Sequence, residues 1–249
     1  MIDVTSPDFW PTLLANLWKA TLETLYMVGA TMVITFVVGL VLGVLLVSTD
    51  RGGVLEKPFG SRALGRTINV VLSIVVNITR SVPFLILMIA LIPFTYLLLG
   101  TSFGSSAAIV PLSISAIPFF ARLAEIALRE VPDGRIEAAE ALGSTRWQIL
   151  TKVLVPESLP AMIRGFATTV VSIINFSAIA GTIGAGGLGD LAVRYGHQRY
   201  STEYILCVVV VLVVLVQGLQ TFGEWLAKRL DHERSAGRAA ATATAATGS

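Results

Sequence analysis

The sequence predicts an all-α membrane protein with five transmembrane helices, and three observations support this prediction. Of 249 residues, 54% are apolar and only 14% are charged, whereas a typical soluble chain carries roughly a quarter of its residues as charged ones. The charge-free stretches have the lengths that membrane-spanning helices require. Lys and Arg residues gather on one side of these stretches, as they do on the cytoplasmic side of membrane proteins. The composition therefore excludes a cytosolic enzyme, a nucleic-acid binder and a disordered scaffold.

Four long stretches contain no Asp, Glu, Lys or Arg. Three of them, with 26, 25 and 20 residues, hold one span each, because a helix needs about 20 apolar residues to cross a bilayer. The fourth, residues 81–121, has 41 residues, and the Gly and Ser residues near its middle predict a tight turn between two further spans. The expected spans cover about residues 24–48, 75–99, 105–127, 160–181 and 204–226.

The second span is the least regular of the five. As one helix, residues 67–99 would extend over about 50 Å, which exceeds the thickness of a bilayer. Counting back about 20 residues from the end of this stretch places Arg80 near one membrane interface, with residues 67–77 as a tilted or interfacial lead-in. Pro83 and Pro93 predict a kink in the span.

The positive charges also orient the chain. With Arg80 set aside, the first connection, the third connection and the C-terminal tail together carry 14 Lys and Arg residues, against three on the other side. We therefore expect the N-terminus outside and the C-terminus in the cytoplasm. The chain divides into an extracytoplasmic or interfacial segment 1–21, a transmembrane domain 22–221 and a cytoplasmic tail 227–249. The tail is rich in Ala and Thr without an apolar face, which predicts disorder.

A polar loop on the predicted cytoplasmic side, residues 129–158, has the signals of two short helices, and we call it the bracket. Asp133 can cap the first helix, and Gly143 stands where a left-handed residue would end it. Ser144 can cap the second helix, which we expect to end before Pro156. The alternative interpretation is a solvated loop with ordinary helix caps.

A spaced pattern lies inside the bracket, and it consists of Glu137, Ala138, Ala139, Gly143, Val153, Val155 and Pro156. This pattern resembles the EAA motif of ABC-importer permeases, in which the last part reads Ile-x-Leu-Pro. Here two valines stand in for Ile and Leu, which are conservative apolar changes. The resemblance implies the type I ABC-importer permease fold, with a cytoplasmic coupling helix between spans three and four.

The resemblance also implies a role for each of these residues. The coupling helix would dock in a groove on a separate ATPase subunit, where Glu137 would pair with that partner. Ala138 and Ala139 would allow close packing, Gly143 would make the bend, and Pro156 would set the start of the fourth span. A short helix anchored at both ends by membrane spans transmits displacement without chemistry of its own.

Further motifs between about residues 22 and 221 resemble the methionine-import permeases, and they are Arg80-Ser81-Val82-Pro83-Phe84 and Gly184-Ala185-Gly186-Gly187-Leu188-Gly189. That family implies a homodimer in a bacterial cytoplasmic membrane, with two ATPase subunits inside and a methionine-binding lipoprotein or periplasmic protein outside. The cargo would be methionine, as the D- or L-enantiomer or both. An importer for another amino acid or small polar solute is the alternative. An ion-coupled secondary transporter is more distant, because midplane carboxylates and internal repeats are not visible.

Polar residues within the spans are candidates for the transport path or a subunit interface, and they are Asn77, Arg80, Asn175 and Ser177. Each has a simpler interpretation as well: Arg80 can extend its charge to the interface, and the others can hydrogen-bond between helices. Because the spans hold almost no charge, they would pair poorly with a zwitterion. We therefore expect selectivity to rest largely with the binding protein.

Four glycines near the outer end of the fourth span are candidates for an outer gate or for close helix packing, and they are Gly184, Gly186, Gly187 and Gly189. Three of them satisfy the dinucleotide pattern G-x-G-x-x-G, but that pattern has meaning only between a strand and a helix. Asp190, which follows them, lacks the second carboxylate that an aspartyl protease needs.

The sequence offers no site for ATP hydrolysis or for a metal ion. No Gly-Lys dipeptide occurs, so the chain lacks a phosphate-binding Walker loop, and we expect ATP and Mg to bind to the partner ATPase. His197 and His232 have no partner at metal-ligand spacing. We therefore expect a transport subunit with no cofactor of its own and no enzymatic activity.

Overall fold

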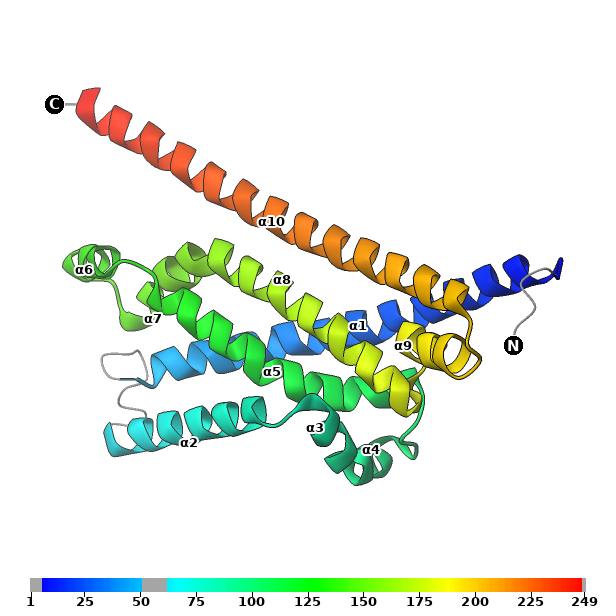
Figure 1. Cartoon of the computed structure of the whole chain (residues 1–249). Coiled ribbons are helices and arrows are strands. Elements are labelled where there is room, and N and C mark those ends of the chain that lie inside the picture. The colour runs from blue at the N-terminus through cyan, green and yellow to red at the C-terminus, as the bar shows by residue number, and fades with distance from the viewer. Residues whose placement is uncertain (1–5, 51–61, 248–249) are drawn as a thin grey trace.

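The computed structural model describes residues 6–50 and 62–247, and no strand occurs among them (Figure 1). Side chains are described for residues 6–50 and 63–230. Within this part of the chain, four helical stretches are long and apolar enough to cross a membrane. These stretches contain α1 (Phe9–Ser48), α5 (Ser105–Arg129), α8 (Val155–Ala180) and the first part of α10 (Thr202–Thr247).

The second span is broken, which corrects the prediction of one kinked helix over residues 75–99. Helices α2 (Arg62–Ser81) and α3 (Phe84–Ala90) meet at an angle of 105°. Pro83 lies between them with an extended ψ of 135°, and the residue before a proline is sterically disfavoured in a helix. After α3, the chain turns again into α4 (Ile92–Leu99). The described residues therefore reach five spans only if the bent pair α2 and α3 counts as one span.

Both ends of the described chain are more helical than the sequence predicted. Helix α1 begins at Phe9 and includes most of the segment that we expected at the interface. Helix α10 continues to Thr247, where we expected a disordered tail. Alanine has the highest helix propensity of all residues, so an Ala-rich sequence can extend a helix without an apolar face.

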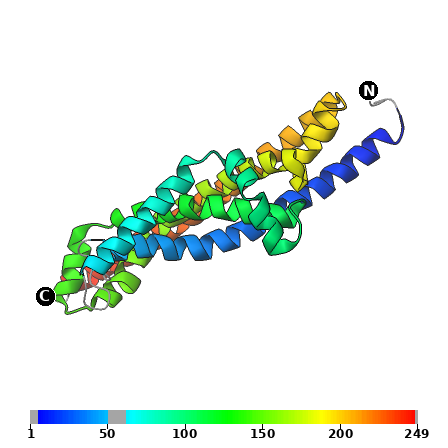
Figure 2. The ribbon, with the colours of Figure 1, turned by 90° about the horizontal axis from the view of Figure 1, so that it is seen from below.

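The bundle is built around the contact of α1 with α5, which run side by side through its middle (Figures 1 and 2). Gly43 allows this approach, because a Cβ atom there would lie 2.8 Å from the carbonyl oxygen of Ala121 and 2.8 Å from the Cβ of Ala124. An aromatic cluster then joins α1, α5 and α8. Its ring centroids are separated by 5.1 to 6.1 Å, and its members are Phe36, Phe120 and Phe166.

The bundle has two distinct ends. In both ribbon views, α6 (Asp133–Ala141), α7 (Arg146–Ile149) and the C-terminus lie at one end, which we call the bracket end. Helix α9 (Gly187–Leu191) and the N-terminus lie at the opposite end, which we call the glycine end. Because the long apolar helices run between these two ends, the lipid bilayer must surround the part between them.

Because α1 and α5 lie so close together at Gly43, a single methyl group added there should lower the stability of the protein. Gly43→Ala should lower the free energy of unfolding by about 1–3 kcal/mol, because the new Cβ meets backbone and forces the two helices apart. Thermal unfolding of the purified protein in detergent measures this effect. Gly29→Ala is the matched control, since no atom lies within 4 Å of its added Cβ. An equal loss of stability in both variants would contradict the assignment of this contact.

Candidate functional site

The bracket begins with α6, whose C-terminal end has the geometry that the sequence predicted. Gly143 has a φ of +75°, a left-handed conformation that favours glycine. Its N–H donates to the carbonyl of Glu140 at 2.9 Å, and the N–H of Ser144 donates to the carbonyl of Ala139 at 3.0 Å. These two bonds form a Schellman motif, which satisfies the last carbonyls of the helix. The expected cap at the start of α6 is wrong, because Pro132 is the N-cap residue and Asp133 lies inside the first turn.

Helix α7 is capped by Thr145, which corrects the expectation that Ser144 would do this. The Thr145 hydroxyl accepts a hydrogen bond from the N–H of Gln148 at 3.3 Å, and the Gln148 side chain accepts one from the N–H of Thr145 at 2.8 Å. Such a reciprocal capping box satisfies two otherwise unpaired donors at the start of a helix. The turn between α6 and α7 therefore has a defined conformation.

The second short helix does not end before Pro156, contrary to the prediction. A π-helical turn over Leu150–Leu154 connects α7 to α8, and Pro156 lies at the first turn of α8. Pro156 lacks an N–H that could bond to the preceding turn, and the π-turn accommodates this altered hydrogen-bonding pattern within the helical run. As a result, α7 of the bracket and α8 form one helical run, which continues from Arg146 to Ile183 and ends where Gly184 leaves the helical conformation.

Ion pairs attach the rest of the bracket to the bundle. Arg135 of α6 pairs with Glu157 in the first turn of α8. At the end of α5, the Arg129 guanidinium lies 2.7 Å from Asp50, which follows α1, and 3.0 Å from Glu125 of its own helix. The bracket is therefore tied to the ends of α1, α5 and α8.

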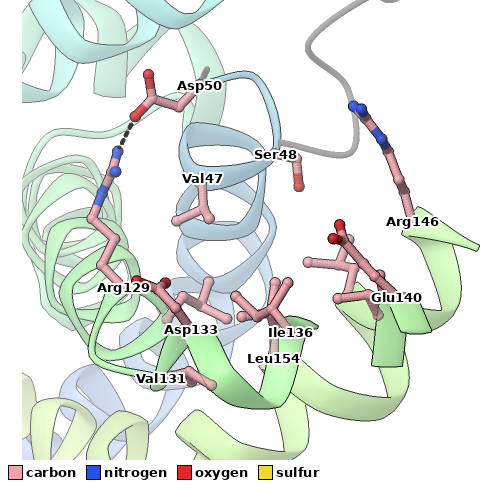
Figure 3. A pocket seen from close by; sticks show the side chains of 13 residues that line it. Val47, Ser48, Asp50, Arg129, Val131, Asp133, Ile136, Glu140, Arg146 and Leu154 are labelled. Atoms are coloured by element: carbon pink, nitrogen blue, oxygen red, sulfur yellow. Dashed lines mark hydrogen bonds and ion pairs between the residues drawn. The ribbon is translucent and has the colours of Figure 1, made fainter. Parts of the chain in front are cut away.

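A cavity of about 320 Å³ lies behind the bracket, between the end of α1 and helices α6 and α7 (Figure 3). Arg129 and Asp50 point toward each other at one side of it, while Glu140 and Arg146 lie at the other side. Apolar side chains from α1, α5 and α6 line the rest of the cavity, among them Val47. The bracket therefore rests on a partly open space rather than on a fully packed core.

The bracket exposes only part of the EAA-like pattern. Glu137, Ala138 and Gly143 are exposed, whereas Ala139, Val153, Val155 and Pro156 are half-buried. Two large apolar side chains of the bracket are exposed as well: Leu142 is 85% exposed and Trp147 is 64% exposed. Sequence reasoning missed both of them. A signal was present for Leu142, because it precedes the glycine that ends α6.

Helix α8 and the π-helical turn after it carry a polar stripe, which consists of the exposed Arg164, Thr168, Asn175 and Thr182 and the half-buried Ser172. The residues recur every three to seven positions, which keeps them on one face of a helix. A polar stripe on a membrane span is unfavourable against lipid, so such a stripe faces a water-filled path or another protein. The stripe therefore marks a face of α8 that lipid does not cover in the assembled protein.

The four polar candidates from the sequence do not all lie on such a surface. Asn175 belongs to the polar stripe, and Asn77 and Arg80 are exposed on α2. The Arg80 guanidinium lies 5.9 Å from the centre of the Phe119 ring of α5. Ser177 is buried, and its hydroxyl donates to the carbonyl of Ile174 at 2.7 Å within its own helix.

The four gate candidates form a tightly built turn at the glycine end. Gly184, Gly186 and Gly187 have φ values of +94°, +80° and +77°, which other residues adopt only with strain. Gly189 allows α9 to lie against α8, since a Cβ atom there would be 2.1 Å from the carbonyl oxygen of Ala178. The glycines are therefore needed for the path of the backbone, in agreement with the close packing that we expected.

Helix α1 holds this turn in place. The N–H of Gly187 donates to the Glu23 carboxylate at 2.8 Å, and the N–H of Leu188 donates to the Thr24 hydroxyl at 2.9 Å. Both donors belong to the first turn of α9, which has no side-chain cap of its own. Glu23 and Thr24 thus satisfy N–H groups that lipid could not pair, and the sequence analysis did not find them.

Removing one of these acceptors should weaken the glycine end. Thr24→Val leaves the buried N–H of Leu188 without a partner, so we expect a loss of about 1–3 kcal/mol in stability and faster amide exchange in residues 184–191. Hydrogen exchange measured by mass spectrometry reports this directly. Thr21→Val is the matched control, because the Thr21 hydroxyl donates only to the carbonyl of Leu17 within its own helix. Unchanged exchange in the Thr24 variant would refute this role.

Nothing in the described residues resembles a catalytic or metal centre. No group of three or more His, Cys, Asp or Glu side chains that could hold a metal ion occurs among them. Glu125 is buried within α5, and it accepts hydrogen bonds from Arg122 at 2.7 Å and from Arg129 at 3.1 Å.

Comparison with known proteins agrees with this description. Residues 58–235 match the family described as the binding-protein-dependent transport system inner membrane component. The chain is 50% identical to the probable D-methionine transport system permease protein of Vibrio cholerae, over 87% of this chain and 92% of that protein. It is 43% identical to the methionine import system permease protein of Bacillus subtilis, over 88% of this chain and 95% of that protein.

A solved structure shares the fold. A chain of the MetNI methionine ABC transporter, in a crystal form described as inward facing, superimposes with a TM-score of 0.79 at 40% sequence identity. The match covers 91% of this chain and 99% of that chain. The helical bundle described above is therefore the type I ABC-importer permease fold that the sequence resemblance implied. The chain belongs to the family of binding-protein-dependent transport system inner membrane components.

Proposed function

We propose that this chain is the permease subunit of an ATP-driven importer for methionine, with the bracket as its coupling element. The observation that carries this proposal is the attachment of the bracket. Its outer surface exposes Glu137, Leu142 and Trp147, while its inner side continues into α8 without a helix break. A surface that is open to a partner and rigidly joined to a membrane span is what coupling requires.

The same proposal includes the orientation of the chain in the membrane and the proteins that bind to it. The bracket end lies in the cytoplasm, where an ATPase subunit binds to the bracket, and the glycine end faces outward toward a binding protein. ATP and Mg bind to the ATPase, and this chain does no chemistry. Two copies of the chain enclose the path. The polar stripe of α8 supports this arrangement, since a path enclosed by two copies keeps such a surface away from lipid.

The transport cycle follows from these attachments. ATP binding draws two ATPase subunits together and moves the two brackets with them. Because α7 of each bracket and its α8 are one helical run, the movement reaches the glycine end and opens the path to the loaded binding protein. Hydrolysis of ATP releases the brackets and returns the path to the inward-facing state. Both methionine enantiomers are candidate cargo, because the relatives carry names for D-methionine and for methionine.

Replacing the exposed apolar residue of the bracket tests the docking surface. Leu142→Asp should reduce co-purification with the ATPase subunit at least about tenfold, since a desolvated apolar anchor typically contributes more than 1 kcal/mol to an interface. The fold should not change, because Leu142 is 85% exposed. Tyr200→Asn is the matched control, with 80% exposure at the glycine end. Equal co-purification of wild type and both variants would exclude the bracket as the docking surface.

Breaking the ion pair between α6 and α8 tests the transmission of movement. Arg135→Glu should leave ATPase binding nearly intact but lower ATP-dependent methionine uptake relative to ATP hydrolysis, because one attachment of the bracket to α8 is lost. Uptake into proteoliposomes and phosphate release measure the ratio of the two. The charge-reversed double variant Arg135→Glu/Glu157→Arg should restore the ratio in large part. No ATP-dependent uptake by the wild-type complex would contradict the proposed function itself.

A further inference from the structure

A second cavity lies between α8 and α10 near the bracket end, with a volume of about 380 Å³. We call it the exit groove, and its lining residues are Arg164, Ala167, Thr168, Val171, Gln220, Glu224 and Lys228. The two helices meet at its floor, because a Cβ atom on Gly223 would lie 2.5 Å from the Cβ of Ala167. The glycine therefore brings the two lined faces close enough to contact one small molecule together.

Each wall of the exit groove is one helix face. On α10, Gln220, Glu224 and Lys228 recur at intervals of four residues and share a face. On α8, Arg164 and Thr168 are also the first two members of the polar stripe. The exit groove thus lies where the polar stripe ends, at the bracket end of the membrane span.

The exit groove contains both positively and negatively charged side chains, and these side chains do not pair with one another. Among the described residues, Arg164, Glu224 and Lys228 form no ion pair with one another or with a neighbour. Their neighbour Arg229 differs, because its guanidinium lies 5.4 Å from the centre of the Trp225 ring. The three charged groups of the exit groove are therefore available to a ligand.

We propose that the exit groove is a weak binding site for a zwitterionic amino acid with an apolar side chain, occupied as cargo leaves the membrane path. This inference rests on the proposed function. The ligand carboxylate binds Arg164, whose guanidinium pairs with both carboxylate oxygens, and the ligand ammonium binds Glu224. The apolar side chain lies against Ala167 and Val171. Lys228 leaves the site with a net positive charge, which disfavours cationic cargo.

Two features of the exit groove are consistent with a site that binds cargo weakly and releases it. All three charged side chains are exposed, so water competes for them and ion pairs there contribute little to affinity. Glu224 also distinguishes this site from one for an anionic lipid, because a carboxylate beside a phosphate group is repulsive. The charge pattern therefore favours a zwitterion over a lipid headgroup.

Ligand-detected NMR on the full complex of this chain with its ATPase subunit, without nucleotide and in lipid nanodiscs, tests the inference. The probes are L-methionine, its analogue without the amino group and its methyl ester. We expect the wild type to bind methionine about fivefold more tightly than either analogue, as for one exposed ion pair lost. Glu224→Gln should abolish only the preference over the deaminated analogue, and Arg164→Gln only the preference over the ester.

Arg229→Gln is the matched control, since it removes a neighbouring cation outside the exit groove and should leave both preferences unchanged. Wild-type preferences in both groove variants would overturn the inference. So would a loss of co-purified phosphatidylglycerol in Arg164→Gln with both preferences unchanged, because that result assigns the site to a lipid. ATP-dependent methionine uptake by the wild type, measured in parallel, separates these outcomes from a failure of the proposed function, which predicts no uptake at all.

Discussion

The constraint on which this structure depends is that lipid offers no hydrogen-bonding partner to a backbone N–H or C=O group. Every helix break inside the bilayer must therefore be satisfied by the protein itself. At the break of the glycine end, Glu23 and Thr24 accept hydrogen bonds from Gly187 and Leu188. The first turn of α5 and the residue before it add two more bonds to the same segment. Three helices that are far apart in the sequence are thus joined where the backbone is least regular.

At the bracket end, α7 and the fourth span form a single helical unit. At Pro156 the chain does not leave the helix, because the π-turn over Leu150–Leu154 accommodates the change within the helical run. The run from Arg146 to Ile183 ends before the non-helical Gly184, and it extends over about 57 Å at 1.5 Å per residue. A displacement of α7 therefore reaches the glycine turn along one helix. The close packing of α1 against α5 provides the firm surface against which such a helix can move.

The features that sequence analysis predicted well are those that depend on local composition and spacing. Charge-free length predicted the spans, and the position of Gly143 predicted a left-handed residue that the backbone confirms. The N-cap residue of α7 could also have been predicted from the sequence. A capping box needs Glu or Gln three residues after the cap, and Thr145 has Gln148 there, whereas Ser144 has Trp147. The contact of Thr24 with Leu188 joins residues 164 positions apart, and no local pattern encodes it. The angle at Pro83 likewise depends on packing against α5 and α8.

On the proposed path, the polar stripe would offer a zwitterion only weak contacts. The hydroxyls of Thr168 and Ser172 donate to carbonyls of their own helix, at 3.0 Å and 3.1 Å, so toward the path they offer only acceptor lone pairs. These hydroxyls cannot donate a hydrogen bond to a carboxylate. They can accept weak hydrogen bonds from an ammonium group, and similar acceptors recur at each turn of the helix. Each additional 1.4 kcal/mol of binding, approximately, would slow release about tenfold. Weak and repeated contacts therefore favour passage over retention, and strong discrimination between solutes must take place before the cargo reaches α8.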